Sequence, residues 1–345
     1  MSRLILFSAA IALISSAALA VEPAPATVTS TKAGGIGNNG LVTSETIDGG
    51  IKFTTGEGAE SSFAHNTYEV VYKPPADDVD YLKAERAMTA KDYAKAIESY
   101  RASAAKSKFD WVRQSSAVSV ALCAQALKKP EDGIAAIQGL EKDYPKSVRL
   151  PEALLIKARL LADKGDKAEA VKVLTALAGH DKDWGLKEAS KGATGLGEIL
   201  VADQKFADAV ALLSPWLAKI AKFPNDFATI GLLLGQAQAG SSAVPAALDT
   251  YRAVAFSAAD PSLQARAHIE WSKLLAAKTT LPDLMASFDH AAIAALIKGV
   301  DGNVRGEALK VAKEVVAKIV AASPGNDDAK NKVKIEYTTY LGKLQ

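Results

Sequence analysis

The chain has 345 residues, of which 49% are apolar and 23% are charged, and its formal net charge is only +2. An apolar fraction of this size is enough to build a buried core, so the composition excludes an intrinsically disordered chain. The 41 basic and 39 acidic residues are mixed along the whole sequence. No basic tract of the kind that binds nucleic acid stands out, and no nucleic-acid partner is expected.

The first 20 residues have the pattern of an export signal. Arg3 supplies a positive charge, an apolar run interrupted by serines follows, and Ala18-Leu19-Ala20 ends it. The run is shorter than the roughly 18 apolar residues that span a bilayer. We therefore expect cleavage after Ala20 and export to the periplasm or outside the cell, with retention of the signal as an anchor as the alternative. No other segment is apolar enough to cross a membrane, so no membrane span is predicted in the mature chain.

Residues 21–40 are predicted to form a flexible leader, and residues 41–75 a small β module. The leader begins with a stretch rich in Pro, Ala and Thr. Within the module, three short β-branched or aromatic segments are separated by Asp48-Gly49-Gly50 and Gly56-Glu57-Gly58, which are turn sequences. This pattern predicts a small β-meander, with a partly closed SH3-like barrel as the more closed form of the same module. Pro74-Pro75 marks its end, and Asp77 or Asp78 is expected to cap the first helix.

A helix-turn-helix pattern then recurs every 37 to 39 residues. Each copy has a small residue, an aliphatic residue next to it, and a large apolar or aromatic residue four positions after the small one. The small residues are Ala96, Gly133, Ala170, Ala209 and Ala247. Twelve positions before each lies a second small residue, in the preceding helix: Ala84, Ala121, Ala158, Gly197 and Gly235. A steady period of this length predicts a solenoid, in which each helix pair packs on its neighbours.

These copies resemble the tetratricopeptide repeat. The segment KDYAKAIESY, Lys91 to Tyr100, is similar to the start of the second helix of that repeat, and Lys164–Leu174 and Asp203–Leu213 are further copies. Leu196-Gly197 and Leu234-Gly235 match the Leu-Gly pair of the family. The copies are longer than the usual length of about 34 residues and lack the first-helix Trp. The resemblance implies a mainly α-helical fold, an α-solenoid of about five or six helix pairs, preceded by the β module.

The repeats are expected to cover residues 76–261. The individual copies are placed at about 77–110, 114–147, 151–184, 190–223 and 228–261. Residues 262–345 are predicted to contain a degenerate repeat followed by C-terminal capping helices. The last helix is richer in Lys and polar residues, as the exposed end of a repeat array requires.

No motif in the sequence indicates catalysis or metal binding. His65, His180, His268 and His290 are scattered and are interpreted as surface or loop imidazoles, and Cys123, the only cysteine, as a buried structural thiol. Within GGIGNNG, Gly35, Gly37 and Gly40 match G-x-G-x-x-G. No βαβ unit surrounds them, so they are interpreted as a flexible loop. We therefore predict no enzyme activity, no cofactor and no metal site.

The inner face of the solenoid is the remaining candidate surface. In the register of the tetratricopeptide repeat, first-helix residues that turn inward are predicted to form a partner-binding groove: Tyr81, Glu85, Met88, Gln125, Arg159, Glu198 and Gln236. Four of these, Glu85, Arg159, Glu198 and Gln236, occupy equivalent positions in their repeats. The mixture of apolar and charged groups suits an extended or helical peptide segment. The Lys and Asn array with which members of the family hold a C-terminal carboxylate is missing.

The favoured function is a non-catalytic scaffold for protein–protein interaction, acting in the periplasm or outside the cell on a protein or peptide partner. One alternative is an accessory subunit of an envelope assembly or secretion machine that contacts its partners through the β module. Another, from a different class, is a carbohydrate-binding or hydrolytic protein. The sequence alone selects no partner and no oligomeric state.

Overall fold

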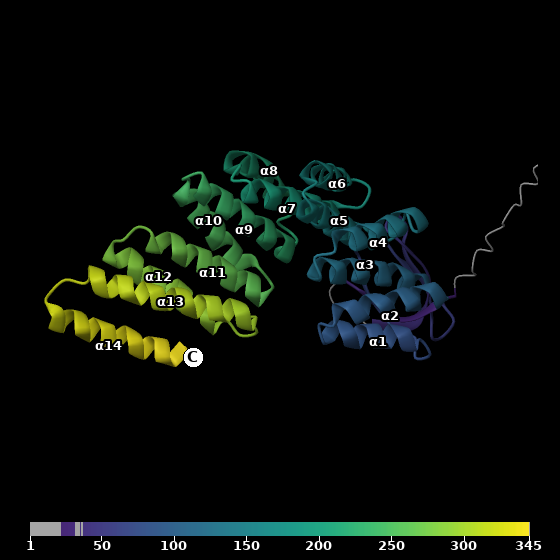
Figure 1. The fold of residues 1–345 in the computed structure, drawn as a ribbon, viewed down its shortest axis with the longest axis horizontal. Helices are drawn as coiled ribbons and strands as arrows, with labels where there is room; N and C mark the ends of the chain where they lie inside the picture. Colours follow the sequence, from purple (N-terminus) through teal and green to yellow (C-terminus); the bar gives the residue numbers. More distant parts are fainter. Residues whose placement is uncertain (1–21, 32–34, 36, 345) are drawn as a thin grey trace, which may run out of the picture. The chain divides into compact units, whose positions relative to one another are not determined.

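The computed structural model describes residues 22–31, 35 and 37–344 (Figure 1), so the predicted export signal lies outside the described residues. The chain divides into two compact units. Unit 1 runs to Ala117, apart from the turn Thr46–Gly49, and unit 2 contains that turn and the chain from Val118 onward. Each unit has its own core, and each is described below by itself.

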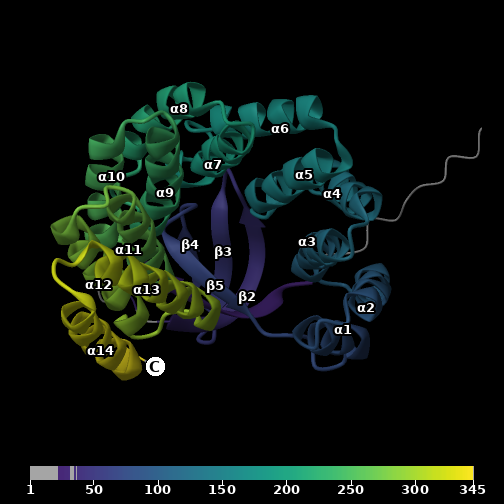
Figure 2. The same ribbon diagram turned by 60° about the vertical axis from the view of Figure 1, so that its left-hand side comes forward.

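Unit 1 begins with a five-stranded antiparallel sheet. The strands are β1 (Ala24–Ser30), β2 (Gly37–Thr46), β3 (Gly50–Thr55), β4 (Glu60–Phe63) and β5 (Tyr68–Tyr72). They lie in the order β4-β3-β2-β1-β5, so four consecutive strands form a meander and the fifth returns to pair with the first (Figure 2). The predicted β module is therefore present, with two strands more than the three segments identified in the sequence.

The prediction of a flexible leader over residues 21–40 was wrong. Ala24, Ala26 and Val28 alternate with more exposed residues and are buried in β1, which pairs with β2 on one side and β5 on the other. The interpretation of Gly35 to Gly40 as a loop was also wrong from Gly37 onward, because β2 begins there. A Cβ atom at Gly40 would lie 2.3 Å from the carbonyl oxygen of Thr54. The glycine is therefore required by the close approach of another backbone.

One side of the sheet carries the apolar core of the module. Its buried members are Ala26, Val28, Val42, Ile51 and Phe53. The ring of Phe63 stacks on Phe53 with the two centroids 5.8 Å apart. Because successive side chains of a strand point to opposite faces of the sheet, the alternating apolar residues of these strands gather on one face and form this cluster.

Fourteen α-helices follow in the described part of the chain. Six pairs correspond to the predicted repeats and the degenerate sixth: α1 (Val79–Thr89) with α2 (Tyr93–Lys106), α3 (Asp110–Ala126) with α4 (Pro130–Asp143), α5 (Leu150–Lys164) with α6 (Lys167–Gly179), α7 (Leu186–Ala202) with α8 (Phe206–Lys219), α9 (Pro224–Gly240) with α10 (Val244–Ser257), and α11 (Pro261–Ala276) with α12 (Leu281–Leu296). The last two helices are α13 (Gly302–Ala322) and α14 (Asp327–Leu344).

Short polar side chains and glycine set the ends of these helices. Asp92, Asp166 and Asp301 each accept a hydrogen bond from a backbone N–H in the first turn of the helix that they precede. Such caps satisfy donors that have no partner inside the helix. Gly165 ends α5 in the left-handed conformation, with φ of 95°, which glycine adopts without steric cost. The breaks between helices therefore follow directly from the sequence.

In unit 2, the first helix of each pair packs against the first helix of the next. These contacts join α5 to α7, α7 to α9, α9 to α11 and α11 to α13, in addition to the contacts within each pair. Figure 1 shows these helices following one another in chain order from teal to yellow. Nearest-neighbour packing of this kind defines an α-solenoid, so the predicted mainly α-helical fold class is confirmed.

The small residues of the repeat pattern lie where the two helices of a pair cross. Ala96, Ala170 and Ala209 have no exposed surface. A Cβ atom at Gly197 would lie 2.8 Å from Leu213 Cδ2, and one at Gly235 would lie 2.4 Å from Tyr251 Cε1. The small residue of the first helix thus faces the large residue of the second, as the register predicts.

A larger side chain at such a crossing should destabilise the repeat. We expect Ala170→Leu to lower the free energy of unfolding by roughly 1–3 kcal/mol, because Ala170 is fully buried and added methylene groups overpack the contact. Urea denaturation followed by circular dichroism measures this change. An unchanged denaturation midpoint would contradict the register.

Candidate functional site

Three of the seven predicted groove residues lie in unit 1, on α1. Tyr81 is only 8% exposed, and its ring packs edge-on against Tyr100 and Trp111. The carboxylate of Glu85 accepts a hydrogen bond of 2.7 Å from the Tyr100 hydroxyl, while Met88 is half-buried. Tyr81 therefore belongs to the core of unit 1, and Glu85 has a structural partner.

Three of the other four residues meet in one pocket of unit 2. Gln125 at the end of α3, Arg159 on α5 and Glu198 on α7 line a pocket of about 290 Å³. Its remaining lining residues come from α5, from α6 and from α7 with the residue that follows it: Leu155, Ala158, Ala162, Asp163, Lys167, Leu174, Gly195, Ile199, Ala202 and Asp203. We call this the Arg159 pocket. It joins two successive repeats, because equivalent positions on α5 and α7 are brought side by side by the helix stacking.

The floor of the Arg159 pocket is apolar. Leu155 and Ile199 are half-buried and Leu174 is buried. Gly195 allows these groups to come together, since a Cβ atom there would lie 2.5 Å from Leu174 Cδ2 and 2.9 Å from Leu155 Cδ1. A concave apolar surface of this kind, with polar groups at its edge, is suited to receiving a ligand side chain.

The rim of the pocket carries charges of both signs. The Arg159 guanidinium donates two hydrogen bonds to the Glu198 carboxylate, at 2.7 Å from Nη2 and 3.1 Å from Nε. Lys167 forms an ion pair with Asp203. Asp163 lines the same rim, and among the residues that the structure describes its carboxylate has no hydrogen bond or ion pair. Both ion pairs, Arg159 with Glu198 and Lys167 with Asp203, connect one repeat to the next. The carboxylate of Asp163 is available to a ligand.

Gln236 lies at a separate, smaller pocket. This pocket of about 190 Å³ is lined by Gln236 and Leu232 on α9, Tyr251 on α10, Arg266 and Glu270 on α11, and Glu307 on α13, among others. Lys273 donates to Glu270 at 2.6 Å and to Glu307 at 2.8 Å, which links α11 to α13. The Arg266 side chain forms no hydrogen bond or ion pair with the residues that the structure describes. Gln236 therefore does not share a pocket with Arg159 and Glu198.

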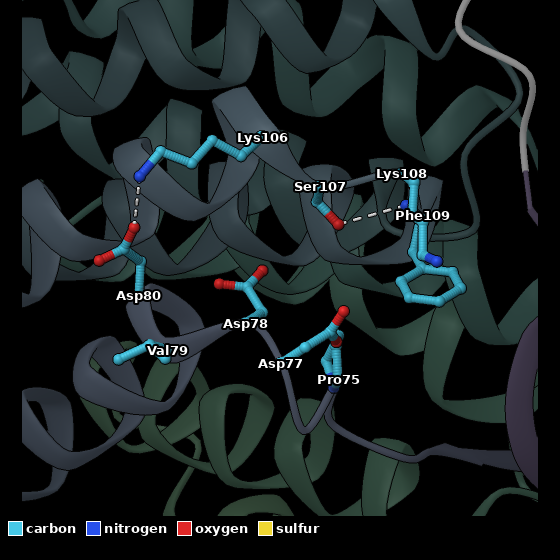
Figure 3. Close-up of a pocket in the computed structure, with 9 residues that line it drawn as sticks. All are labelled: Pro75, Asp77, Asp78, Val79, Asp80, Lys106, Ser107, Lys108 and Phe109. Carbon is cyan, nitrogen blue, oxygen red and sulfur yellow. Dashed lines mark hydrogen bonds and ion pairs between the residues drawn. The ribbon is translucent and has the colours of Figure 1, made fainter.

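A third pocket, of about 340 Å³, lies in unit 1 beside the start of α1 (Figure 3). Asp78 caps α1 by accepting from the Tyr81 N–H at 2.9 Å, and it also accepts from the Ser103 hydroxyl at 2.7 Å. Lys106 donates to Asp80 at 2.9 Å, and this contact lowers the pKa of the Asp80 carboxyl. The acidic groups on α1 are thus used to begin and hold the helix, which confirms the predicted capping role of Asp78.

The two histidines of the sixth helix pair come together, contrary to the interpretation of all four as scattered surface or loop groups. His268 on α11 is only 6% exposed, and its Nδ1 lies 3.0 Å from Nδ1 of His290 on α12. Their separation of 22 residues shows no periodic signal. This separation indicates a contact only when α11 and α12 are known to be antiparallel neighbours with a short turn between them.

Cys123 is fully buried, as predicted. Burial raises the pKa of its thiol, and this disfavours the reactive thiolate. Within residues 22–31, 35 and 37–344, no group of three or more His, Cys, Asp or Glu side chains is placed to hold a metal ion. No helix in the same residues is long and apolar enough to cross a membrane.

Comparison with known proteins gives matches among solved structures only. No protein-family model matches the chain, and no curated protein matches it. One similar structure is the C-terminal part of a TPR repeat-containing protein from Cytophaga hutchinsonii, with 16% identity, a TM-score of 0.40, and coverage of 73% of this chain and 98% of the other. Another is the TPR2AB domain of yeast Sti1 in complex with pHSP90, with 15% identity, a TM-score of 0.29, and coverage of 72% and 98%.

A third similar structure is a tetratricopeptide repeat protein from Parabacteroides merdae, with 11% identity and a TM-score of 0.31. It covers 68% of this chain and 97% of the other. All of these structures are tetratricopeptide-repeat proteins.

Proposed function

We propose that this chain is a non-catalytic scaffold that binds a segment of a partner protein in the Arg159 pocket. The partner segment places an aliphatic side chain between Leu155, Leu174 and Ile199, and its polar groups meet the charged rim. The observation that carries this proposal is the pocket itself. It combines an apolar floor with a charged edge and is built by two successive repeats from positions that are equivalent in the sequence pattern.

The proposal includes the place of action expected from the sequence, the periplasm or the outside of the cell. The export signal on which this rests lies outside the described residues. A mature chain exported in this way would meet envelope or extracellular proteins. An extract of the cell envelope is therefore the source in which its partner should be sought.

The first experiment identifies the partner and tests the pocket at the same time. The purified mature chain and its Arg159→Glu variant are used as bait for an envelope extract, and captured proteins are quantified by mass spectrometry. We expect a protein that is retained by the wild-type chain and reduced at least about tenfold with the variant, which corresponds to about 1.4 kcal/mol of binding free energy. Equal capture by both baits would contradict a role for the pocket.

Loss of binding in Arg159→Glu must be separated from loss of structure. The side chains of Arg159 and Glu198 are 42% and 36% exposed, and an ion pair that exposed contributes only about 0–1 kcal/mol to stability. The urea midpoint of the variant should therefore stay close to that of the wild-type chain. Lys95→Glu, an equivalent charge reversal on the exposed face of α2, should change neither stability nor capture.

A charge swap distinguishes recognition from structural support. In the double variant Arg159→Glu with Glu198→Arg, the ion pair can form again in the opposite orientation. If the pocket recognises its partner through these charges, the swap re-forms the ion pair without restoring binding. Recovery of full affinity in the double variant would show that the pair acts only by holding α5 to α7.

The alternative contact surface is the β module, and one observation supports this alternative. Val71 on the terminal strand β5 is 70% exposed, which is unusual for an aliphatic side chain in a sheet. Val71→Glu should leave capture unchanged if the Arg159 pocket is the site. If Val71→Glu abolishes capture and Arg159→Glu does not, the β module is the main contact and the proposed pocket is wrong.

A further inference from the structure

His268 and His290 meet head-on between α11 and α12. Their Nδ1 atoms are 3.0 Å apart, and their ring centroids are 5.2 Å apart. The centroids are thus farther apart than the nitrogens by about the width of one imidazole ring, so the two nitrogens point at each other. This contact is a hydrogen bond only when one nitrogen carries a proton and the other presents its lone pair. The lone pairs do not converge on a third point, as they would around a shared metal ion.

The pair lies in an aromatic environment. The ring of Trp271 stacks on His290 with the centroids 3.9 Å apart, and Phe256 on α10 meets the His268 ring edge-on. One turn away, the hydroxyls of Ser272 and Ser287 are hydrogen-bonded at 2.9 Å between the same two helices. The histidine contact is therefore part of a polar seam inside the α11–α12 interface.

Among the residues that the structure describes, no charged group forms a hydrogen bond or ion pair with either of the two imidazoles. On α11, Arg266 and Glu270 are two positions from His268, and a step of two residues points to nearly the opposite side of a helix. The other charged groups on the surrounding helices are Asp226 of α9, Asp249 and Arg252 of α10, Lys273 of α11, Asp283 and Asp289 of α12, Arg305, Glu307, Lys310, Lys313, Glu314 and Lys318 of α13, and Asp327, Asp328, Lys330, Lys332, Lys334, Glu336 and Lys343 of α14. None of them forms a hydrogen bond or ion pair with either imidazole.

Several of these charged groups are held elsewhere. Arg252 donates to Asp249 at 2.6 Å, Lys273 bridges Glu270 and Glu307, and Lys318 donates to the carbonyl oxygen of Ala276. Among the described residues, a positive charge on the histidine pair would therefore have no hydrogen-bonded carboxylate to neutralise it. The burial of a charge without such a partner is strongly unfavourable.

We propose that the His268–His290 contact is an acid-sensitive joint inside the α11–α12 interface, and that the C-terminal end of the repeat array, α11 to α14, unfolds when both imidazoles are protonated. A first added proton occupies a free Nε2 and leaves the Nδ1–H···Nδ1 hydrogen bond intact. A second added proton places two N–H groups and two positive charges against each other. Because α12, α13 and α14 share one apolar cluster with α11 and the four helices lie at the end of the array, they unfold together as a terminal unit.

The direction of the pH effect follows from the pKa values. Burial lowers the pKa of His268, and the neighbouring His290 lowers it further, to about 4. Burial also lowers the pKa of His290. The unfolded chain, in which an imidazole has a pKa of about 6.5, binds more protons in this range than the folded chain. The stabilisation by the pair is therefore complete above about pH 6.5 and is lost as the pH falls toward about 4.

Hydrogen exchange of the full chain, measured by mass spectrometry at about pH 7 and about pH 4.5 and corrected for the intrinsic exchange rate, tests the joint. The wild-type chain should lose at least about tenfold protection in α11–α14, since one pKa unit corresponds to a tenfold change. The double variant His268→Gln with His290→Gln keeps hydrogen-bonding groups that do not titrate, and it should lose far less. His180→Gln, outside the pair, should behave like the wild-type chain.

Equal loss of protection in the wild-type chain and the double variant would overturn the proposal, as would unchanged protection in the wild-type chain. A second measurement does not depend on the folding of the variant. Nitrogen-15 NMR of the wild-type imidazoles should show the two rings titrating together, with midpoints below about pH 6.5. Independent titration of either ring at about 6.5 or above would also overturn it.

Discussion

Replacing Gly192 with alanine should lower the free energy of unfolding of unit 2 by about 3 kcal/mol. A Cβ atom at this position on α7 would lie 2.4 Å from the backbone nitrogen of Ala178 and 2.5 Å from the carbonyl oxygen of Leu174, both on α6. Neither atom can rotate away, so the two helices have to separate. The better helix propensity of alanine, about 1 kcal/mol, recovers only part of the loss. Urea denaturation followed by circular dichroism measures the net change.

The matched control is Gly139→Ala on α4. A Cβ atom at Gly139 would meet nothing within 4 Å, so alanine adds no clash there. We expect this variant to gain about 0.5–1 kcal/mol through helix propensity alone. If the two variants changed stability by the same amount, the close approach of α6 and α7 would be wrong.

Removal of the large side chain from one repeat crossing should have an effect of similar size. Leu213 has no exposed surface and lies against Gly197, the small residue of the preceding helix. We expect Leu213→Ala to cost about 3–4 kcal/mol, because glycine on the opposite helix offers no side chain to fill the cavity. The free energy of unfolding from urea titration is again the measurement.

The neighbouring Leu212 provides the comparison for this variant. Leu212 is on the same helix but is only partly buried, so Leu212→Ala should cost less than half as much. The order of the two values depends on the predicted register, in which the large residue follows the small one by four positions. A larger loss of unfolding free energy for Leu212→Ala than for Leu213→Ala would mean that the face of α8 that carries Leu212, and not the predicted one, packs against α7.

The repeat architecture could be predicted because its signal is carried by residue size at fixed positions. Gly197 with Leu213 and Gly235 with Tyr251 are pairs of small and large residues at the same separation, and both meet across a helix crossing. The same register places Arg159 and Glu198 at equivalent positions of successive repeats. Because stacking brings such positions together, their assembly in one pocket follows from the sequence pattern.

The first strand could not be predicted in the same way. In β1, the residues that face the core include Ala24 and Ala26, whose small side chains give almost no contrast in hydrophobicity with Thr27 and Thr29 of the same strand. Pro25 adds a signal that disfavours a strand. It is tolerated near the start of β1, where its carbonyl oxygen accepts from the Lys73 N–H at 2.9 Å. Pairing with β2 and β5, which is tertiary information, overrides the local composition.

The histidine pair and the separation of Gln236 from Arg159 also depend on tertiary information. His268 and His290 lie on different helices, and their facing rings depend on how far α12 is rotated about its axis. Gln236 has the equivalent position to Glu198 but contacts a different pocket, formed with α11 and α13. Equivalence in a repeat therefore predicts which face a residue occupies, while the contacts of that residue depend on the side chains of its own neighbours.

The most direct test of the proposed scaffold function is methyl NMR of the full chain with the partner segment identified by capture from the envelope extract. Addition of that segment should shift the methyl resonances of Leu155, Leu174 and Ile199, which form the floor of the Arg159 pocket, and leave those of Leu41 and Val71 in the β module unchanged. Shifts confined to Leu41 and Val71, with the three pocket residues unaffected, would contradict the account.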